Sequence, residues 1–349
     1  MKKLRLCVAL LALLAPAVQA AQPDDSVLLV HGGAGVVRKD MTRADEEAVR
    51  AALELALRKG HEQLTAGKPA LDAVTAAITV LEDAPYFNAG KGAVFTHDGR
   101  NELDSSVMDG ATRKAGAVAG VHTVKNPILL ARAVMEKSEH VMMVGQGAEI
   151  FAKEQGVTLV DPSYFRTEKR WQQLQKALKE EASGQAHTDL DHSDLEPAKY
   201  FGTVGAVALD QDGHLAAGTS TGGMTNKRYG RVGDSPIIGA GTYADAGCAV
   251  SGTGWGEFYI RAAAAHDICA RMTYLKETPQ QAGETVINQI IPKLGGDGGA
   301  IVLGADGAIG MPFNTEGMYR GWIGADGVPH VALYSDETLP SPPTEAARP

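Results

Sequence analysis

Small and apolar residues alternate along the stretch from Gly202 to Asp210. Positions 203, 205, 207 and 209 fall on one face of a strand, and positions 204, 206 and 208 fall on the other. Asp212-Gly213 then supplies the two-residue turn of a hairpin, and residues 215–220 return as a second strand. Two further Asp-Gly pairs, at Asp98 and Asp306, predict more antiparallel hairpins.

The remaining hydrophobic pattern alternates long helices with short strands. We expect helices at 43–66, 69–84, 127–137, 148–155, 163–182, 257–275 and 279–291. Further strands are expected at 26–31, 93–96, 102–108, 115–122, 141–144, 235–240, 246–251, 300–304 and 308–312. Antiparallel hairpins combined with paired helices favour an α+β fold, a four-layer αββα sandwich with two antiparallel sheets face to face and helices outside.

The first twenty residues are typical of a secretion signal. Lys2, Lys3 and Arg5 precede a short apolar run, and Val18-Gln19-Ala20 offers a small-residue cleavage site. The apolar run is too short to span a bilayer. We therefore expect residues 1–20 to be removed and the mature protein to be periplasmic or secreted.

Charge and cysteine content narrow the class of protein. Without the three basic residues of the signal, the net charge of −9 becomes −12. An acidic chain disfavours nucleic acids and anionic membrane surfaces as partners. Cys248 and Cys269 remain in the mature chain. They could pair in an exported protein, but two buried free thiols in a large core are the simpler expectation.

The segment 183–199 differs from the rest of the chain, because it is polar and acidic and has no apolar periodicity. This composition predicts an exposed linker. The linker contains residue types that bind metals, and we interpret them as parts of a solvated tract: His187, Asp189, Asp191 and His192.

Thr203 directly follows Gly202 at the beginning of the central strand. If the bond between these two residues is cut, the threonine gains a free α-amine beside its hydroxyl. Such an amine has an unperturbed pKa of about 7.7–8.0, so it can take the hydroxyl proton near neutral pH. A single Gly-Thr pair is more often structural, since threonine favours strands.

Four clusters rich in glycine and hydroxyl residues follow the linker, at 202–203, 219–223, 230–236 and 251–257. Small residues let a ligand approach the backbone, and hydroxyls supply donors. Arg231 and Asp234 lie three positions apart in one cluster. Together they could hold the carboxylate and the ammonium of an α-amino acid. The same two residues could instead brace each other within the loop.

Two glycine-rich stretches match nucleotide-binding patterns only in part. The stretch 31–35 lacks the Lys-Ser/Thr of a P-loop. The stretch 239–244 has the G-x-G-x-x-G/A spacing, but we expect a strand after it rather than a helix. The sequence also lacks H-E-x-x-H, paired C-x-x-C and G-x-S-x-G motifs, so zinc and serine-hydrolase chemistry have no support.

Six segments, in order along nearly the whole mature chain, carry a family resemblance: His31–Gly35, Phe87–Gly90, Gly202–Asp210, Thr219–Lys227, Gly230–Pro236 and Pro312–Met318. They resemble the isoaspartyl peptidase/L-asparaginase family, the plant-type branch of the N-terminal-nucleophile hydrolases. The resemblance implies the αββα sandwich of those enzymes. It also implies a precursor cut between Gly202 and Thr203 into an α chain, 21–202, and a β chain, 203–349.

The resemblance assigns catalytic roles by position. Thr203 would be the nucleophile and, through its amine, the base. Thr221 would support its hydroxyl, and Asn88 would lie close by. Thr253 and Gly254 would form the oxyanion hole.

The same resemblance implies how substrates bind. Arg231 would bind the substrate α-carboxylate, and Asp234 would bind its α-amine. L-Asparagine and β-aspartyl dipeptides would be the substrates, because both present an L-aspartyl head joined through its side-chain carbonyl. No cofactor is implied for the chemistry, and the implied assembly is an (αβ)2 dimer. A structural Na⁺ is implied for the loop 81–91, held by the backbone carbonyls of Leu81, Glu82, Ala84, Phe87, Ala89 and Lys91.

Two alternatives stay open. A glycosylasparaginase has the same fold, although the stretches 222–227 and 252–255 favour the asparaginase side. An uncleaved amino-acid-binding protein would also suit Arg231 and Asp234. The chain departs from the family pattern in its secretion signal, in the less polar residues 198–201 before Gly202, and in a stretch from 243 to 251 that is about one residue shorter.

Overall fold

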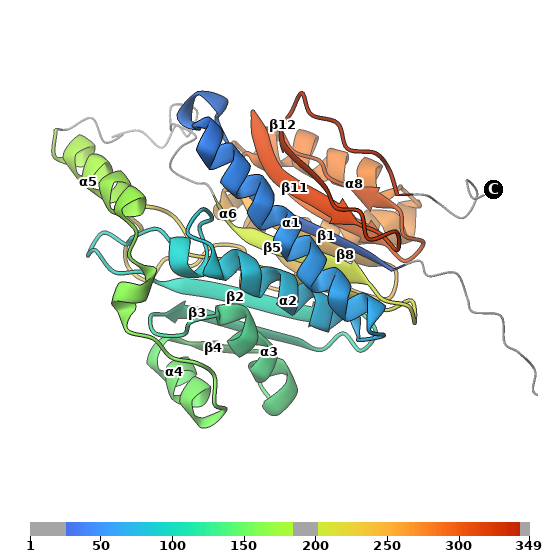
Figure 1. Ribbon diagram of the computed structural model, residues 1–349, viewed down its shortest axis with the longest axis horizontal. Helices are drawn as coiled ribbons and strands as arrows, with labels where there is room; N and C mark the ends of the chain where they lie inside the picture. Colours follow the sequence, from blue (N-terminus) through green and yellow to red (C-terminus); the bar gives the residue numbers. More distant parts are fainter. Residues whose placement is uncertain (1–25, 184–201, 343–349) are drawn as a thin grey trace, which may run out of the picture.

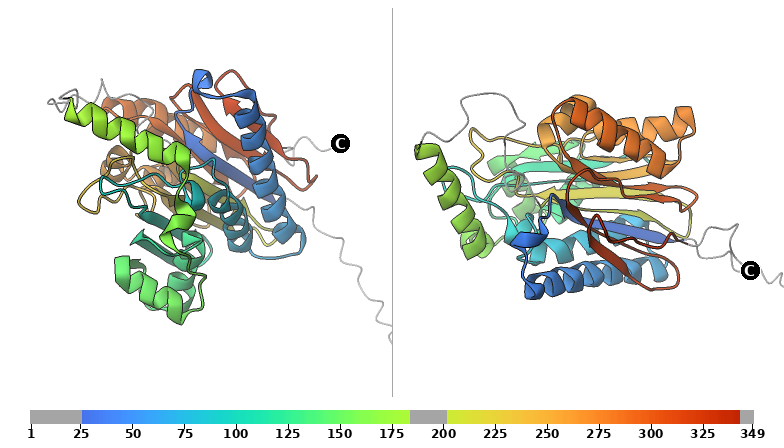
Figure 2. Two further views of the ribbon diagram at one scale, coloured as in Figure 1. Left: turned by 60° about the vertical axis from the view of Figure 1, so that its left-hand side comes forward. Right: turned by 90° about the horizontal axis from the view of Figure 1, so that it is seen from above.

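The computed structural model describes residues 26–183 and 202–342. The expected signal, 1–20, and the expected linker beyond residue 183 fall outside this part, as do the four linker residues of metal-binding type. The described chain forms two sheets packed together, with helices on both outer sides (Figures 1 and 2). The predicted αββα sandwich is therefore confirmed.

The larger sheet has eight strands, and its central strands come from distant parts of the chain. β5 lies between β1 and β6 and is antiparallel to both. β3 and β4 pair in parallel, and the other neighbours are antiparallel. In order across the sheet, the strands are β12 (His330–Tyr334), β11 (Gly317–Ile323), β1 (Val27–Ala34), β5 (Val204–Leu209), β6 (Leu215–Thr221), β2 (Leu103–Asp109), β3 (Ala115–Val121) and β4 (Met142–Val144).

The smaller sheet consists of β10 (Ile309–Gly310), β9 (Gly298–Gly304), β8 (Cys248–Gly254) and β7 (Thr242–Ala244), in that order. β7 begins within the glycine-rich stretch 239–244 that matched the dinucleotide pattern. A strand follows these glycines instead of a helix, so the structure lacks the helix N-terminus that a dinucleotide site needs.

The two faces of β5 belong to two different cores, as its alternation predicts. Val204 and Ala206 pack with the helices that cover the larger sheet. Val207 and Leu209 pack between the two sheets. Because side chains alternate along a strand, Thr203 lies on the face between the sheets.

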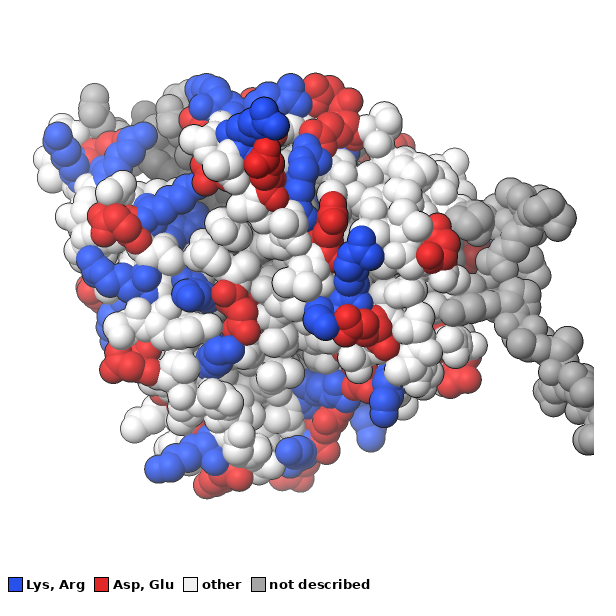
Figure 3. Space-filling view, viewed as in Figure 1, with Lys and Arg blue, Asp and Glu red and all other residues white. Residues whose placement is uncertain are grey.

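One helical layer covers the larger sheet and consists of α1 (Arg43–Thr65), α2 (Ala70–Asp83) and α3 (Pro127–Lys137). Thr42 and Asp45 form a capping box at the beginning of α1. α4 (Gly145–Glu154) flanks the β4 edge, and α5 (Glu168–Ala182) stands at one end of the sandwich (Figures 1 and 2). Acidic and basic side chains are interspersed on this side of the molecule (Figure 3), as in the exposed pair of Arg43 and Glu47.

Shorter helices cover the smaller sheet. They are α6 (Gly256–Ala262), α7 (Ala264–Ala270), α8 (Pro279–Thr285) and α9 (Ile291–Lys293), with π-helical segments at Arg271–Leu275 and Val286–Ile290. The expected continuous helix at 257–275 is therefore wrong, whereas the segment expected at 279–291 is helical throughout and contains one π-helical turn. Ala263 has a left-handed φ of 47° that separates α6 from α7, and Pro292 has no N–H for a regular helical bond. Among the described residues, no helix is long and apolar enough to cross a bilayer.

Two expected strands do not form, and three strands, β7, β11 and β12, were not expected. The backbone N–H of Val94 binds the side chain of Asn88 instead of a neighbouring strand. Segment 235–240 turns around the carbonyl of Asp234, which accepts from Ile237 and Gly241. β11 and β12, which were missed, complete the edge of the larger sheet beside β1.

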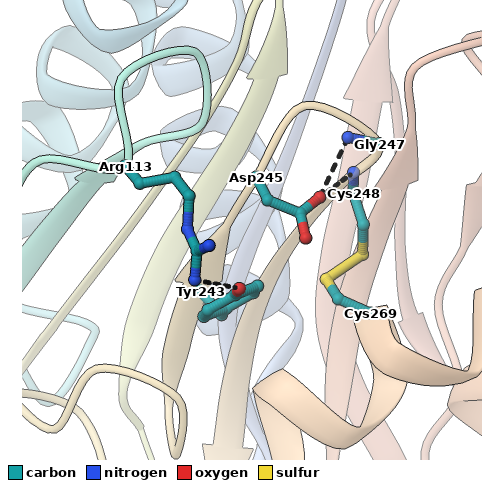
Figure 4. The surroundings of a disulfide bond; sticks show 6 residues. All are labelled: Arg113, Tyr243, Asp245, Gly247, Cys248 and Cys269. Carbon is teal, nitrogen blue, oxygen red and sulfur yellow. Dashed lines mark hydrogen bonds between the residues drawn. A yellow bond between two sulfur atoms is a disulfide. The ribbon is translucent and has the colours of Figure 1, made fainter. Parts of the chain in front are cut away.

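Cys248 and Cys269 form a disulfide, so the expectation of two free thiols is wrong (Figure 4). Cys248 begins β8, and Cys269 lies on α7, which packs on that strand. Their Cα atoms are 5.5 Å apart, within the range that a disulfide requires. Cysteine spacing alone could not show this, because the two residues meet only through the packing of α7.

Candidate active site

Thr203 lies at the beginning of β5, and its hydroxyl donates to the Thr221 hydroxyl at 3.0 Å. The register of β5 and β6 brings these residues together, since Val204 pairs with Ser220. The Thr221 oxygen also accepts from the backbone of Gly223 at 3.0 Å. Thr203 is buried, so its hydroxyl is held in one place away from bulk water.

Asn88 forms a hydrogen bond with the peptide group that precedes Thr203. Its backbone N–H donates to the carbonyl of Gly202 at 3.0 Å. Its side chain donates to Gly223 at 2.7 Å and accepts from Val94 at 2.9 Å. Gly202 has a φ of 130°, and a Cβ at this position would lie 2.4 Å from the Cβ of Asn88. Only glycine fits here, and its carbonyl is fixed beside the threonine hydroxyl.

Thr253 and Gly254, the expected oxyanion residues, lie at the end of β8. The hydroxyl of Thr253 accepts from the backbone of Ala34 at 3.3 Å. The preceding residue, Gly33, contacts Gly202, since a Cβ on Gly33 would lie 2.6 Å from the Gly202 Cα. The structure therefore brings Thr253 toward the bond before Thr203, with its own hydroxyl proton available to another acceptor.

His31 is a residue of this site to which the sequence assigned no role. Its Nδ1 lies 3.0 Å from the carbonyl oxygen of Thr203, and its Nε2 lies 2.8 Å from the hydroxyl of Ser251. Burial lowers the pKa of His31 to about 3, so the ring is neutral. A carbonyl can only accept, so Nδ1 carries the proton and Nε2 accepts from Ser251.

The hydrogen bond from Ser251 to His31 is the first of a series that links buried hydroxyls between the sheets. The Thr219 and Ser251 oxygens are 2.7 Å apart, and Thr242 donates to Thr219 at 2.5 Å. Ser106 lies 2.8 Å from the Thr242 hydroxyl and 2.7 Å from the carbonyl oxygen of Ser235, so its single proton can go to either acceptor. With His31 as an acceptor, every hydroxyl can donate in the same direction, toward Thr203. We call His31, Ser251, Thr219, Thr242 and Ser106 the hydroxyl chain.

The hydroxyl chain ends beside the loop that carries Arg231 and Asp234. These two residues do not hydrogen-bond to each other. Arg231 instead forms a bidentate pair with Glu257, with Nε to Oε1 at 2.9 Å and Nη2 to Oε2 at 2.7 Å. The role of Glu257 was missed, although it closes the last of the four glycine-rich clusters and lies in the first turn of α6.

Asp234 is a buried carboxylate whose Oδ2 has no hydrogen-bond partner among the described residues. Burial raises its pKa to about 7, and the positive charge of Arg231 opposes this shift. Gly241 and Gly256 pack against it, because a Cβ on either would lie 2.8 Å from a carboxylate oxygen. A buried acceptor without a donor suits a cationic ligand such as an ammonium group.

The loop 81–91 has features of a site for a hard cation. Gly90 and Gly92 leave room for carbonyls, since a Cβ on them would lie 2.3 Å from the Glu82 oxygen and 2.1 Å from the Phe87 oxygen, respectively. Neutral carbonyl oxygens are ligands that hard cations prefer. The carbonyls of Leu81 and Ala89 already accept backbone hydrogen bonds at 3.3 and 3.1 Å. The carbonyls of Glu82 and Phe87 therefore fit the role of cation ligands more clearly than the other expected ligands do.

The side chain of Glu82 is buried beside this loop. Its Oε1 accepts from Ser220 at 2.6 Å and from the backbone of Ile128 at 3.0 Å, and its Oε2 has no partner among the described residues. Burial raises the pKa of Glu82 to about 8, and the Ser220 hydrogen bond opposes the shift. Burial therefore favours the neutral form of this carboxyl, next to the strand that carries Thr221.

Asp210, Asp212 and His214 form the group of clustered metal-ligand side chains found in the described residues. Asp210 begins the tight turn between β5 and β6, and its Oδ1 accepts from the backbones of the other two residues at 3.1 and 2.8 Å. These two hydrogen bonds stabilise the turn, and the turn accounts for the close approach of the three side chains.

Comparison with known proteins identifies the family. The model of the family described as asparaginase matches residues 24–333. An isoaspartyl peptidase of Escherichia coli strain K12 is 52% identical over 316 residues, which cover 89% of this chain and 97% of that protein. A plant-type L-asparaginase of Pyrococcus furiosus is 43% identical over 296 residues, covering 83% and 94%. An isoaspartyl peptidase/L-asparaginase of Xenopus laevis is 39% identical over 317 residues, covering 90% and 97%. The chain belongs to the asparaginase family and is a hydrolytic enzyme.

Proposed function

We propose that this member of the asparaginase family cuts its own chain between Gly202 and Thr203. The new N-terminal threonine would then hydrolyse the side-chain amide of L-asparagine and the isopeptide bond of β-aspartyl dipeptides. One observation carries the proposal. The Gly202 carbonyl accepts from the Asn88 N–H at 3.0 Å, directly beside the hydroxyl of Thr203.

Self-cleavage would begin with attack of the Thr203 hydroxyl on the Gly202 carbonyl. The Oγ–C bond forms and the C–N bond breaks, so the amide becomes an ester and the threonine nitrogen becomes an amine that takes the hydroxyl proton. Water then cleaves the ester. The Asn88 N–H would stabilise the negative charge that develops on the Gly202 oxygen.

Turnover would use the same hydroxyl with the new amine as base. Thr203 attacks the side-chain carbonyl of the substrate, and its amine passes the proton to the leaving ammonia or amino acid. The hydroxyl of Thr253 and the backbone of Gly254 would donate to the oxyanion. This role is consistent with the hydrogen bond from Ala34, which makes the Thr253 oxygen an acceptor and leaves its proton free. Water hydrolyses the β-aspartyl ester.

Substrate choice would rest on the free L-aspartyl head. Arg231, oriented by Glu257, would hold the α-carboxylate, and the partnerless Oδ2 of Asp234 would hold the α-ammonium. The bidentate pair with Glu257 leaves Nη1 of Arg231 for the substrate. Relatives from Escherichia coli and Xenopus laevis carry the names isoaspartyl peptidase and isoaspartyl peptidase/L-asparaginase, which supports the same substrates here.

Export, sodium binding and dimerisation are further parts of this proposal. The disulfide between Cys248 and Cys269 supports an exported protein, because such bonds persist in oxidising compartments. A Na⁺ ion would be held by carbonyls of the loop 81–91, where it would stabilise the segment that carries Asn88. An (αβ)2 dimer is supported by the exposed apolar residues at the β4 edge, Val141, Val144 and Ile150.

A side-by-side assay tests the function. Purified protein should release aspartate from L-asparagine and from β-aspartyl-leucine, and should act poorly on glycosylated asparagine. Preference for the glycosylated substrate would instead assign a glycosylasparaginase. An uncut chain that binds L-asparagine without hydrolysing it would assign a binding protein.

A further inference from the structure

Gly202 lines a cavity of about 130 Å³. Its walls include Gly33, Gly202 and the side chains of Tyr86, Tyr319, Lys169 and Arg170. A liquid water takes about 30 Å³, so the cavity has room for several waters or a small side chain. Arg170 and Lys169 come from the beginning of α5, the helix at the end of the sandwich (Figure 2).

Arg170 is a cation without a counter-charge in the described part of the chain. Its Nε donates to the carbonyl of Gly92 at 2.8 Å, and its Nη1 donates to the amide of Gln173 at 3.1 Å. Both acceptors are neutral, and Nη2 has no hydrogen-bond partner among the described residues. The other arginines of the site region differ, since Arg231 pairs with Glu257 and Arg228 pairs with Glu181.

Desolvation makes this arrangement costly without an anion. Burial lowers the pKa of Arg170 to about 10, and the nearby Tyr319, itself kept neutral by a raised pKa, gives no compensating charge. Asp40 also lines the cavity but is exposed to solvent. Lys169 is exposed as well and offsets Asp40, so the uncompensated charge of the cavity walls is that of Arg170.

The position of Gly202 connects this cavity to the reaction. In the proposed turnover, the leaving amine takes its proton from the nitrogen of Thr203, so the two nitrogens must lie next to each other. In the uncut chain, that nitrogen is bonded to Gly202, which lines the cavity. Departure of Gly202 after cleavage would therefore leave space for the leaving group on the side of Arg170.

We propose that Arg170 binds the C-terminal carboxylate of the leaving amino acid of a β-aspartyl dipeptide. This inference rests on the proposed function and deepens it, because it separates the two substrates. A dipeptide releases an amino acid with a carboxylate, whereas L-asparagine releases ammonia. The Arg170 cavity thus favours isoaspartyl peptides and is indifferent to asparagine. The carboxylate that forms on Gly202 after cleavage has the same chemistry, so the test must separate the two sources.

The unmodified enzyme supplies the first test. KM for β-aspartyl-leucine should be about 10- to 100-fold lower than KM for β-aspartyl-leucinamide, the range expected for one charge-assisted contact. Equal KM values would overturn the proposal, and that result is also expected if the Gly202 carboxylate occupies Arg170.

The second test uses Arg170→Met, with Lys176→Met as a matched control at an exposed position of the same helix. Arg170→Met should raise KM for β-aspartyl-leucine by about 10- to 100-fold and leave KM for L-asparagine and for the amide within about twofold. Arg170→Lys should recover part of the loss. Equal losses on all three substrates would show a structural role and overturn the proposal. Activity of the unmodified enzyme on L-asparagine tests the proposed function separately.

Discussion

The imidazole of His31 holds the carbonyl of Thr203 at 3.0 Å and the hydroxyl of Ser251 at 2.8 Å. His31 lies on β1 of the larger sheet, whereas Ser251 lies on β8 of the smaller one, two residues before Thr253. The bond therefore ties the backbone of the proposed nucleophile to the strand that carries the proposed oxyanion donor. Gly205 leaves space for it, because a Cβ there would lie 2.0 Å from the Ser251 oxygen.

The hydroxyl chain should affect the rate of turnover, because it holds His31 against the carbonyl of Thr203. Thr219→Val keeps the shape of the side chain but removes the donor to Ser251, so we expect kcat to fall about tenfold or more with KM within about twofold. Thr219→Ser keeps the hydroxyl and should retain most of the activity. Steady-state kinetics of both variants tests this prediction. Equal activities of Thr219→Val and Thr219→Ser would contradict a positioning role for the hydroxyl.

Arg231→Ala should raise KM for L-asparagine by about 10- to 100-fold while self-cleavage continues, because the Gly202–Thr203 bond offers no free carboxylate to this residue. Arg231→Lys should not restore binding, since a point charge cannot replace the planar fork that Glu257 orients. A denaturing gel and KM measurements check both statements. An uncut Ala variant, or a Lys variant with normal KM, would argue against the assignment.

The ionisation of Asp234 should affect the acid limb of the pH profile of kcat/KM. It must be ionised to hold an ammonium, and burial raises its pKa to about 7, so binding is lost as the pH falls through that value. The Thr203 amine must also be deprotonated, with a pKa of about 7.7–8.0 if unperturbed. The acid limb of log kcat/KM on L-asparagine should therefore approach a slope of 2.

Asp234→Asn should lower kcat/KM at pH 8 by about 10-fold or more and reduce the slope of its acid limb to 1. Asp212→Asn, an exposed substitution in the β5–β6 turn, serves as a control and should keep the profile of the unmodified enzyme. An unchanged profile in Asp234→Asn would remove the ammonium-binding role.

The sequence predicted the sandwich and the place of Thr203 because period-two alternation is a local signal, and β5 obeys it on both faces. It could not predict partners that meet only through packing. His31 and Ser251 are 220 positions apart, and Arg231 in a loop meets Glu257 in α6, 26 positions away. The strand expected at 93–96 failed for a related reason, since Asn88 takes the N–H that a neighbouring strand would need.

The disulfide should stabilise the fold without serving catalysis. Cys248 begins β8 and Thr253 lies near its other end, about 16 Å away along the strand. The bond closes a loop with a sequence separation of 21, which corresponds to about 3 kcal/mol. The double variant Cys248→Ala/Cys269→Ala should lose several degrees in Tm and keep its kcat at 25 °C. An unchanged Tm in calorimetry would contradict this account.

Cleavage at Thr203 is the central claim, and N-terminal sequencing with intact mass measurement tests it most directly. Protein purified without added protease should contain two chains, and the smaller should start with Thr203. Thr203→Ala lacks the attacking hydroxyl and should stay one inactive chain, while Thr203→Ser should cut and turn over more slowly. An intact chain that hydrolyses L-asparagine, or a Thr203→Ala variant that still cuts itself, would contradict the account.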